Sequence, residues 1–332
     1  MRKLLALLTL VQVGLLCGCG GGGGYGGGGT TPPPGVVCSN INASLAQQLQ
    51  NPAILFSADN NGVLVQMPAV GAGGAATAPG ALVFGIGTQS NNALGTATVL
   101  TEDPSSGFIS ALYKSTTYPD GYLDSGSNGI FLNDSTFPTC ASPLQSWFCP
   151  ASTMAESATL TGQNSATATA NFSISNAQTT FNGNSGFTAF SDVGGPTSDT
   201  AGLDLGMPFF YGRNVFIGIE NHTSPGGTGP YFAFSDLTTA IPAAGAPNVE
   251  AITVNSGPTA LPQPAVNTAY TSVKVCVPGT TTCQTIDNIE VDTGSIGLRI
   301  VSSALTITLP AEKDGSGHPM AECQKFADGT SS

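Results

Sequence analysis

The chain of 332 residues is long enough for one large domain or two ordinary ones, each with its own hydrophobic core. Only 8% of the residues are charged, and 8 basic against 20 acidic side chains give a net charge of −12. This balance argues against nucleic acid as a partner, because binding to phosphates depends on clustered lysines and arginines. Gly, Ser, Thr, Ala and Val abound, and alternating stretches such as residues 271–275 predict an all-β protein.

The first residues predict an export signal. Arg2 and Lys3 precede an apolar run over residues 4–16, which is too short to span a bilayer comfortably. Residues 16–19, Leu-Cys-Gly-Cys, resemble the bacterial lipoprotein cleavage box, in which the cysteine after glycine becomes the lipidated first residue. We therefore expect an exported protein, lipid-anchored to the bacterial cell envelope through Cys19 and located at the outer membrane. An ordinary secretory signal with incidental cysteines is the alternative.

Composition then divides the rest of the chain. Residues 20–29 are nearly all glycine and residues 30–34 are Thr and Pro, which predicts a flexible spacer that becomes stiffer. Short apolar stretches alternate with polar turns from about residue 51 to 234. The predicted organisation is a signal peptide over 1–18, a tether over 19–45, a β lobe over 46–235, a linker over 236–248 and a partial β lobe over 249–332.

An aspartate motif, Leu123-Asp124-Ser125-Gly126-Ser127, lies between apolar segments in the first of these lobes. The pattern predicts a strand, a sharp turn with Asp124 at its tip, and a second strand. Residues 203–219 are also apolar, and two buried strands interrupted by Gly and Pro are the simplest interpretation.

Cysteine usage agrees with export, because an even number of cysteines outside the cytoplasm permits disulfides. Cys140 and Cys149 flank a loop that holds the only tryptophan, and Cys276 and Cys283 flank a predicted hairpin turn, so two local disulfides are expected. The pairing of Cys38 with Cys323 stays open, since geometry decides it. The chain has no C-x-x-C pair and only two histidines, so we expect no metal site and no cofactor.

A second aspartate motif, Val291-Asp292-Thr293-Gly294-Ser295, matches the first. Two such turns could bring two carboxylates face to face, where like charges cannot both ionise and one proton is shared. Asp124 and Asp292 are therefore the candidate catalytic pair of an aspartic peptidase. Each motif alone is also an ordinary turn sequence, since Asp caps its own backbone and Gly accepts a positive φ.

The motifs also carry a family resemblance that covers nearly everything after residue 45. Residues 84–87 (Phe-Gly-Ile-Gly), the Asp124 motif, and Leu205-Gly206 with the strand that follows are similar, in order and spacing, to the C-terminal lobe of a pepsin-like aspartic peptidase. The Asp292 segment resembles the start of the N-terminal lobe. Longer segments resemble an uncharacterised bacterial lipoprotein family, a domain of unknown function that is itself similar to pepsin-like and retropepsin-like peptidases: residues 61–63, 84–92, 124–129, 208–213 and 275–279.

The resemblance implies a pepsin-like acid-protease lobe with a partial second lobe, and peptide-bond hydrolysis by water activated between Asp124 and Asp292. It implies a peptide or protein substrate. The supporting residues that it implies lie beside the two aspartates and are Ser125, Gly126, Ser127, Thr293, Gly294 and Ser295. Ser125 and Thr293 would brace the turns, the glycines would allow close approach, and the two outer serines would bond the carboxylates.

Two departures from the peptidase pattern keep other functions open. The chain reverses the order of the two lobes, and only residues 293–332 follow Asp292. All seven tyrosines precede Asp292, so the tyrosine-bearing flap of pepsins has no counterpart. The alternatives are a non-catalytic envelope lipoprotein that binds a peptide or protein, and a rearranged, inactive fragment of the family. The oligomeric state stays open.

Overall fold

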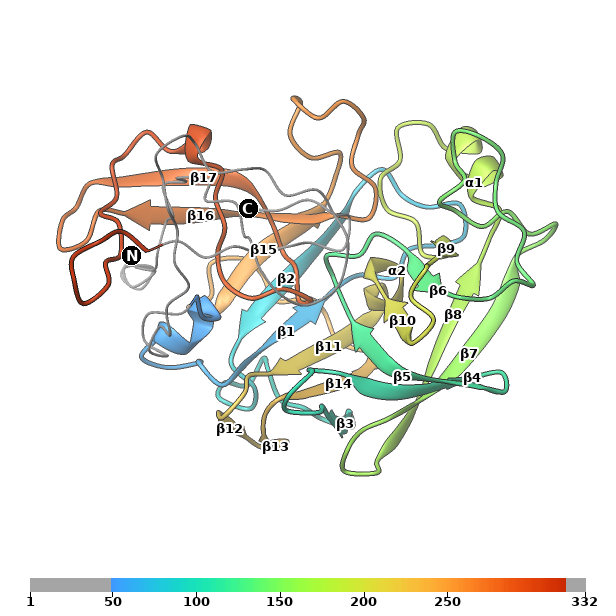
Figure 1. Ribbon diagram of the computed structural model, residues 1–332, viewed down its shortest axis with the longest axis horizontal. Helices are drawn as coiled ribbons and strands as arrows, with labels where there is room; N and C mark the ends of the chain where they lie inside the picture. Colours follow the sequence, from blue (N-terminus) through green and yellow to red (C-terminus); the bar gives the residue numbers. More distant parts are fainter. Residues whose placement is uncertain (1–48, 321–332) are drawn as a thin grey trace. The chain divides into compact units, whose positions relative to one another are not determined.

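The computed structural model describes residues 49–320 (Figure 1), and these are predominantly β-strand, which confirms the all-β class. They divide into two compact units. The larger unit holds residues 53–272 and 287–295, and the smaller unit holds residues 49–52, 273–286 and 296–320. The signal peptide, the tether, the lipidation residue Cys19 and the pair Cys38 and Cys323 lie outside the described residues. No helix in residues 49–320 is long and apolar enough to cross a membrane.

One sheet has eight strands in the order β17-β16-β15-β2-β1-β11-β14-β3. Its strands, in chain order, are β1 (Gly62–Gln66), β2 (Ala78–Phe84), β3 (Thr98–Thr101), β11 (Arg213–Gly218), β14 (Tyr231–Asp236), β15 (Val249–Val254), β16 (Ala269–Cys276) and β17 (Cys283–Glu290). Every residue of the central strand β1 is buried, as expected for a strand that is covered on both faces.

A second sheet has seven strands in the order β8-β7-β4-β5-β10-β6-β9. Its strands are β4 (Ile109–Tyr113), β5 (Thr116–Leu123), β6 (Ile130–Leu132), β7 (Met154–Thr161), β8 (Thr167–Ile174), β9 (Gly194–Pro196) and β10 (Gly202–Leu205). Two short strands, β12 (Thr223–Ser224) and β13 (Gly227–Thr228), form a separate hairpin. The helical segments are η2 (Pro52–Leu55), α1 (Ala177–Gly183), α2 (Met207–Phe210) and η3 (Ser302–Ala304).

Strand β10 organises the middle of the seven-stranded sheet. It pairs in parallel with β5, with Leu205 opposite Leu123, and antiparallel with β6, with Leu205 opposite Ile130. The segment between β5 and β6 carries the Asp124 motif. Both strands that flank this segment pair with β10, so β10 lies beside both ends of the turn. The two buried strands expected in this segment are β10 and β11, and the Gly and Pro that interrupt them start the single helical turn α2, because Gly206 and Pro208 suit a helix start.

The chain after residue 248 rejoins the eight-stranded sheet. Strand β15 lies antiparallel to β2, with Val249 opposite Val83 and Val254 opposite Ala78. The turn after β15 leads into β16, whose residue Ala269 lies opposite Val254 and accepts a backbone hydrogen bond from Val291. The Asp292 motif is thus attached to the sheet that begins with β1 and β2.

The hydrophobic core cluster next to the aspartate motifs contains residues from both sheets of the larger unit. Members close to the two aspartate motifs are Leu123, Ile130, Leu205, Met207, Phe209, Phe210 and Val291. Burial of these side chains is the main stabilising contribution, at about 1.5–3 kcal/mol for each large one. The core therefore fixes the strand ends from which both motifs emerge.

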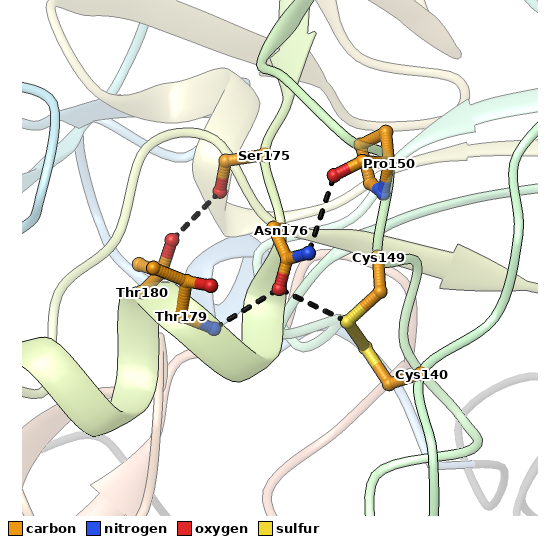
Figure 2. The surroundings of a disulfide bond; sticks show 7 residues. All are labelled: Cys140, Cys149, Pro150, Ser175, Asn176, Thr179 and Thr180. Atoms are coloured by element: carbon orange, nitrogen blue, oxygen red, sulfur yellow. Dashed lines mark hydrogen bonds between the residues drawn. A yellow bond between two sulfur atoms is a disulfide. The ribbon is translucent and has the colours of Figure 1, made fainter.

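Both expected local disulfides are present, Cys140–Cys149 and Cys276–Cys283. Figure 2 shows the first beside the start of α1, where Asn176 caps the helix by accepting a hydrogen bond from the Thr179 backbone at 3.0 Å. The Asn176 amide also donates to the Pro150 carbonyl. A disulfide sulfur carries no hydrogen, so the 3.2 Å approach of Cys149 Sγ to Asn176 Oδ1 is a contact and not a donated bond.

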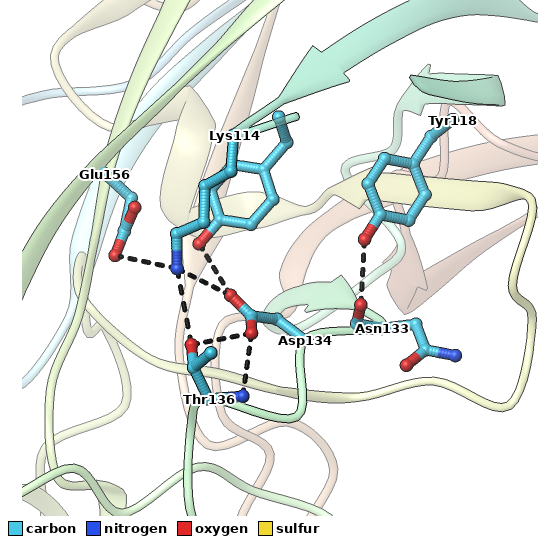
Figure 3. Close-up of polar contacts among 7 residues, drawn as sticks. Lys114, Tyr118, Asn133, Asp134, Thr136 and Glu156 are labelled. Carbon is cyan, nitrogen blue, oxygen red and sulfur yellow. Dashed lines mark hydrogen bonds and ion pairs between the residues drawn. The ribbon is translucent and has the colours of Figure 1, made fainter. Parts of the chain in front are cut away.

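A polar cluster ties β4 to the loop after β6 and to β7 (Figure 3). Lys114 Nζ lies 2.8 Å from Asp134 Oδ2 and 3.7 Å from Glu156 Oε1. Thr136 donates to the other oxygen of Asp134 through both its backbone and its hydroxyl. Burial alone would raise the pKa of Asp134, but hydrogen bonds from Lys114 and Thr136 outweigh it and lower the pKa to about 2.

Candidate active site

The two aspartate motifs begin at the ends of β5 and β17, and both lie in the larger unit. The backbone N–H of Asp124 donates to the Leu205 carbonyl at 3.2 Å, so β10 holds the first turn. The Ser127 N–H closes that turn by donating to the Asp124 carbonyl. In the second motif, the Val291 N–H donates to Ala269 and fixes the residue just before Asp292.

The two turns brace each other through a reciprocal set of hydrogen bonds. The Ser125 N–H donates to Thr293 Oγ1 at 2.9 Å, and the Thr293 N–H donates to Ser125 Oγ at 3.1 Å. Each hydroxyl also donates across the pair, from Ser125 to the Val291 carbonyl and from Thr293 to the Leu123 carbonyl. Ser125 is fully buried, and every polar atom in this interlock has a partner.

The interlock brings the two carboxylates together. The Gly294 N–H lies 2.8 Å from Asp292 Oδ1 and 3.1 Å from Asp124 Oδ1, so the two inner oxygens share one donor. The Gly126 N–H donates to Asp124 Oδ1 as well, at 2.8 Å. Both side chains are half-buried, which leaves the pair open to solvent.

The outer carboxylate oxygens have partners of their own. Ser127 Oγ donates to Asp124 Oδ2 at 2.9 Å, and Ser295 Oγ donates to Asp292 Oδ2 at 2.5 Å. All eight predicted site residues therefore lie in one place, and their approximate two-fold arrangement matches the repeated Asp-Ser/Thr-Gly-Ser sequence.

Glycine is required in both turns by close approach across the pair. A Cβ on Gly126 would lie 2.5 Å from Asp292 Oδ1, and a Cβ on Gly294 would lie 2.6 Å from Asp124 Cγ. Real Cβ atoms do not approach this closely, so any side chain would push the opposite carboxylate away. Each glycine thus lets one turn lie directly against the aspartate of the other.

The electrostatics of the pair favour a retained proton. Burial raises the pKa of Asp124, and the charge and hydrogen bonding of Asp292 raise it further. The Gly126 N–H and the Ser127 hydroxyl act in the opposite direction by stabilising the ionised form. The net effect raises the pKa of Asp124 to about 7, so a proton is retained at the facing carboxylates up to near neutral pH.

Sequence reasoning missed two buried polar residues beside the site. Asp204, in the middle of β10, is 6% exposed, and its Oδ2 lies 2.5 Å from Ser127 Oγ, within hydrogen-bond distance. Asn267 is fully buried and bonds the Phe190 backbone, the Tyr211 hydroxyl and the Asn128 carbonyl. The sequence signal that could have identified Asp204 is its position between two leucines in an otherwise apolar strand.

Metal-ligating side chains do not gather elsewhere in the described chain. In residues 49–320 no group of three or more His, Cys, Asp or Glu side chains has a geometry that could hold a metal ion. His222 and His318 lie in exposed loops, where each contacts nearby residues of its own turn.

Comparison with protein families gives one match, to a family described as a protein of unknown function (DUF3443). The match covers residues 32–234 and 244–332, which is most of the chain. The chain belongs to the DUF3443 family. Both aspartate motifs, and Asp204 with them, lie in the matched DUF3443 segments, and the break in the match covers the end of β14 and part of the segment that leads to β15. A search of curated proteins finds no match to this chain.

Proposed function

We propose that this DUF3443 protein is an aspartic endopeptidase with an acid-protease fold. The observation that carries the proposal is the pair of facing carboxylates, Asp124 and Asp292, which share the Gly294 N–H. The reciprocal Ser125–Thr293 interlock supports it, because it holds two independent turns at the close separation that a shared proton requires. The fit of β10 between β5 and β6 supports the pepsin-like assignment of this half of the site.

The reaction follows from the proton that the pair holds. A water bound between Asp124 and Asp292 loses a proton to the ionised carboxylate as its oxygen attacks a peptide carbonyl carbon. The protonated partner donates a hydrogen bond to the oxygen on which negative charge develops. Proton transfer to the leaving nitrogen then breaks the C–N bond and releases an amine and a carboxylic acid. Ser127 and Ser295 keep both carboxylates oriented throughout.

Cleavage of an unfolded protein, such as reduced and carboxymethylated lysozyme, tests the proposal over pH 3–7. We expect Asp124→Asn and Asp292→Asn each to reduce the rate by at least about a thousandfold, since residues that act as a unit fail together. Asp120→Asn is the matched control, because it makes the same change four residues earlier on β5. Equal cleavage by the wild type and both dyad variants overturns the peptidase.

The alternative to the peptidase is a protein that binds a peptide without cleaving it. An extended peptide can add to an exposed strand edge without being cut. Isothermal titration with a statine-type peptide, which mimics the tetrahedral intermediate, distinguishes the two. The peptidase binds it far more tightly than the matching substrate peptide and loses that preference in the Asp292→Asn variant. A binding protein holds both peptides equally, with or without the aspartates.

We also propose export and lipid anchoring at Cys19, on the sequence pattern alone. The partner implied is a membrane surface, which the lipid would enter. Labelling with a radioactive fatty acid in the native host should mark the wild type and leave Cys19→Ser unlabelled. Label in both variants, or in neither, contradicts the anchor and leaves the peptidase proposal unaffected.

A further inference from the structure

A third carboxyl group lies directly behind the dyad. Asp204 is in β10, where it is paired with Tyr122 of β5 on one side and Phe131 of β6 on the other. Its Oδ2 lies 2.5 Å from Ser127 Oγ, and the same Ser127 Oγ lies 2.9 Å from Asp124 Oδ2. Asp204 Oδ1 is buried, with no hydrogen-bond partner among residues 49–320.

The hydrogens available to Asp204, Ser127 and Asp124 decide which group donates and which accepts in each hydrogen bond. One hydroxyl lies between two carboxyl groups, and each contact is within hydrogen-bond distance. Ser127 has one hydroxyl hydrogen and can donate only one strong bond. Two good bonds need two hydrogens, so the second must lie on one of the two carboxyl groups.

The surroundings place that second hydrogen on Asp204. Asp124 Oδ1 accepts backbone N–H bonds from Gly126 and Gly294, which stabilise a negative charge. Asp204 has no backbone donor of this kind in the described chain, and its side chain is almost completely buried. A buried carboxyl with so few donors is far less costly when it is neutral.

We propose that Asp204 is a positioning residue for the dyad: it stays protonated, donates its own hydrogen bond to Ser127 Oγ, and thereby fixes the Ser127 hydroxyl as a donor to Asp124. Asp204 never touches the substrate and acts only through Ser127. The hydrogen bonds then run in one direction, from Asp204 to Ser127 to the outer oxygen of Asp124.

The charges around Asp204 agree with this direction. Burial raises the pKa of Asp204 well above its usual value, and the negative charges of Asp124 and Asp292 raise it further. Ser127 and the Tyr122 hydroxyl act in the opposite direction, and Asp199 acts on Tyr122 in turn. Glu290 is a further acid within electrostatic reach of the dyad. The two dyad carboxylates therefore both favour a neutral Asp204.

The hydrogen-bonding surroundings of Asp124 and Asp292 therefore differ. Ser127 connects Asp124 to a further acid, whereas Ser295 donates to Asp292 Oδ2 with no second carboxyl bonded to it in the described residues. The donor chain behind Asp124 favours the ionised form of that carboxylate. This contribution opposes the burial and the charge of Asp292, which raise the pKa of Asp124.

The kinetic test rests on the proposed function and compares two replacements at Asp204. Asparagine can still donate to Ser127 through its amide, so Asp204→Asn should keep kcat within about threefold of the wild type at pH 4. Leucine fills the same volume without a donor, so Asp204→Leu should lower kcat by about 10- to 100-fold, as expected for loss of a supporting partner. KM should stay unchanged in both.

The pH profile adds a measurement that a purely structural role would not move. Without the Asp204 donor, the Ser127 hydroxyl can rotate away, the ionised Asp124 is less stabilised, and its pKa rises. The acid limb of kcat should therefore shift to higher pH in Asp204→Leu and stay in place in Asp204→Asn. In a Ser127→Ala background the leucine replacement should add no further effect. Equal kcat and equal acid limbs in both Asp204 variants overturn the proposal.

The proton itself can be measured without any substrate. Carboxyl carbon-13 NMR of the labelled protein, with the Asp204 signal assigned by its disappearance in Asp204→Asn, reports ionisation directly. We expect Asp204 to remain protonated at pH 6, where exposed aspartates are ionised. Titration of Asp204 near pH 4 overturns the proposal. If the signal stays protonated but the wild type cleaves no peptide, the positioning proton stands and the peptidase alone is refuted.

Discussion

Ser125 and Thr293 exchange hydrogen bonds in both directions, backbone to hydroxyl, across 168 residues of sequence. Neither turn is complete without the other, because each hydroxyl accepts from the opposite N–H and then donates to the carbonyl that precedes the opposite aspartate. The separation of the Asp124 and Asp292 carboxylates is therefore set by backbone atoms.

Removal of either hydroxyl should loosen this interlock. We expect Ser125→Ala and Thr293→Val each to lower the free energy of unfolding by about 1–3 kcal/mol, since each leaves a buried N–H without its acceptor. Thr117→Val, an exposed change in β5, is the control and should alter it by less than about 0.5 kcal/mol. Urea denaturation of the single and double variants gives the coupling, and strict additivity contradicts the interlock.

Small side chains at the two turn glycines should separate the dyad. In Gly126→Ala and Gly294→Ala the new methyl group would overlap the opposite carboxylate, so the shared proton should be lost together with peptide cleavage. Gly183→Ala is the matched control, because nothing lies within 4 Å of a Cβ at that position in α1. A crystal structure of Gly126→Ala with Asp124 and Asp292 undisturbed would contradict this account.

A buried acid away from the site should make stability depend on pH. Burial raises the pKa of Glu102 to about 8, and its Oε1 lacks a partner among the described residues. A group whose pKa is higher in the folded state contributes stability that is complete below pH 4.5 and is lost as pH rises to about 8. The loss is at most about 5 kcal/mol, at about 1.4 kcal/mol per pKa unit.

The glutamine variant should remove that dependence. Glu102→Gln cannot ionise, so its unfolding free energy should stay flatter between pH 5 and 8 and exceed that of the wild type at pH 8. Thermal or urea unfolding at several pH values measures this. Parallel curves for the two proteins would show that Glu102 is ionised at its usual pKa.

The cluster around Lys114 should produce the opposite trend at lower pH. The pKa of Asp134 is lowered to about 2, so its contribution is present above about pH 4 and is lost as pH falls through 2. Asp134→Asn should cost about 1–2 kcal/mol at pH 6, because Lys114 is nearly half-exposed and solvent screens the pair. The cost should vanish near pH 2. A variant that matches the wild type at pH 6 refutes this role.

Local pattern predicted the features that depend on neighbouring residues. The disulfides Cys140–Cys149 and Cys276–Cys283 were predictable because each closes a short loop. The strand class followed from period-2 alternation. The roles of Asp124 and Asp292 stay predictions, although the turns that carry them have the geometry that the paired motifs suggest.

Features that depend on distant pairing were not predictable in this way. The sequence of β15 does not indicate that it pairs with β2, because many β-strands of similar composition could pair there equally well. Asp204 went unrecognised because only the parallel register of β10 with β5 brings it behind Ser127. The strands β10 and β11 were expected with an interruption by Gly and Pro, but the sequence pattern did not specify that the interruption is the helical turn α2.

The long span between Ser125 and Thr293 also bears on when activity can arise. Asp124 is made early and is then a lone carboxyl on an unfinished turn, with no Gly294 N–H to bind and no partner with which to share a proton. Closure of so large a loop is slow relative to local strand pairing. Under the proposed peptidase function, an incomplete chain would lack the facing carboxylates, and hydrolysis would begin only once β17 and the Asp292 motif have joined the fold.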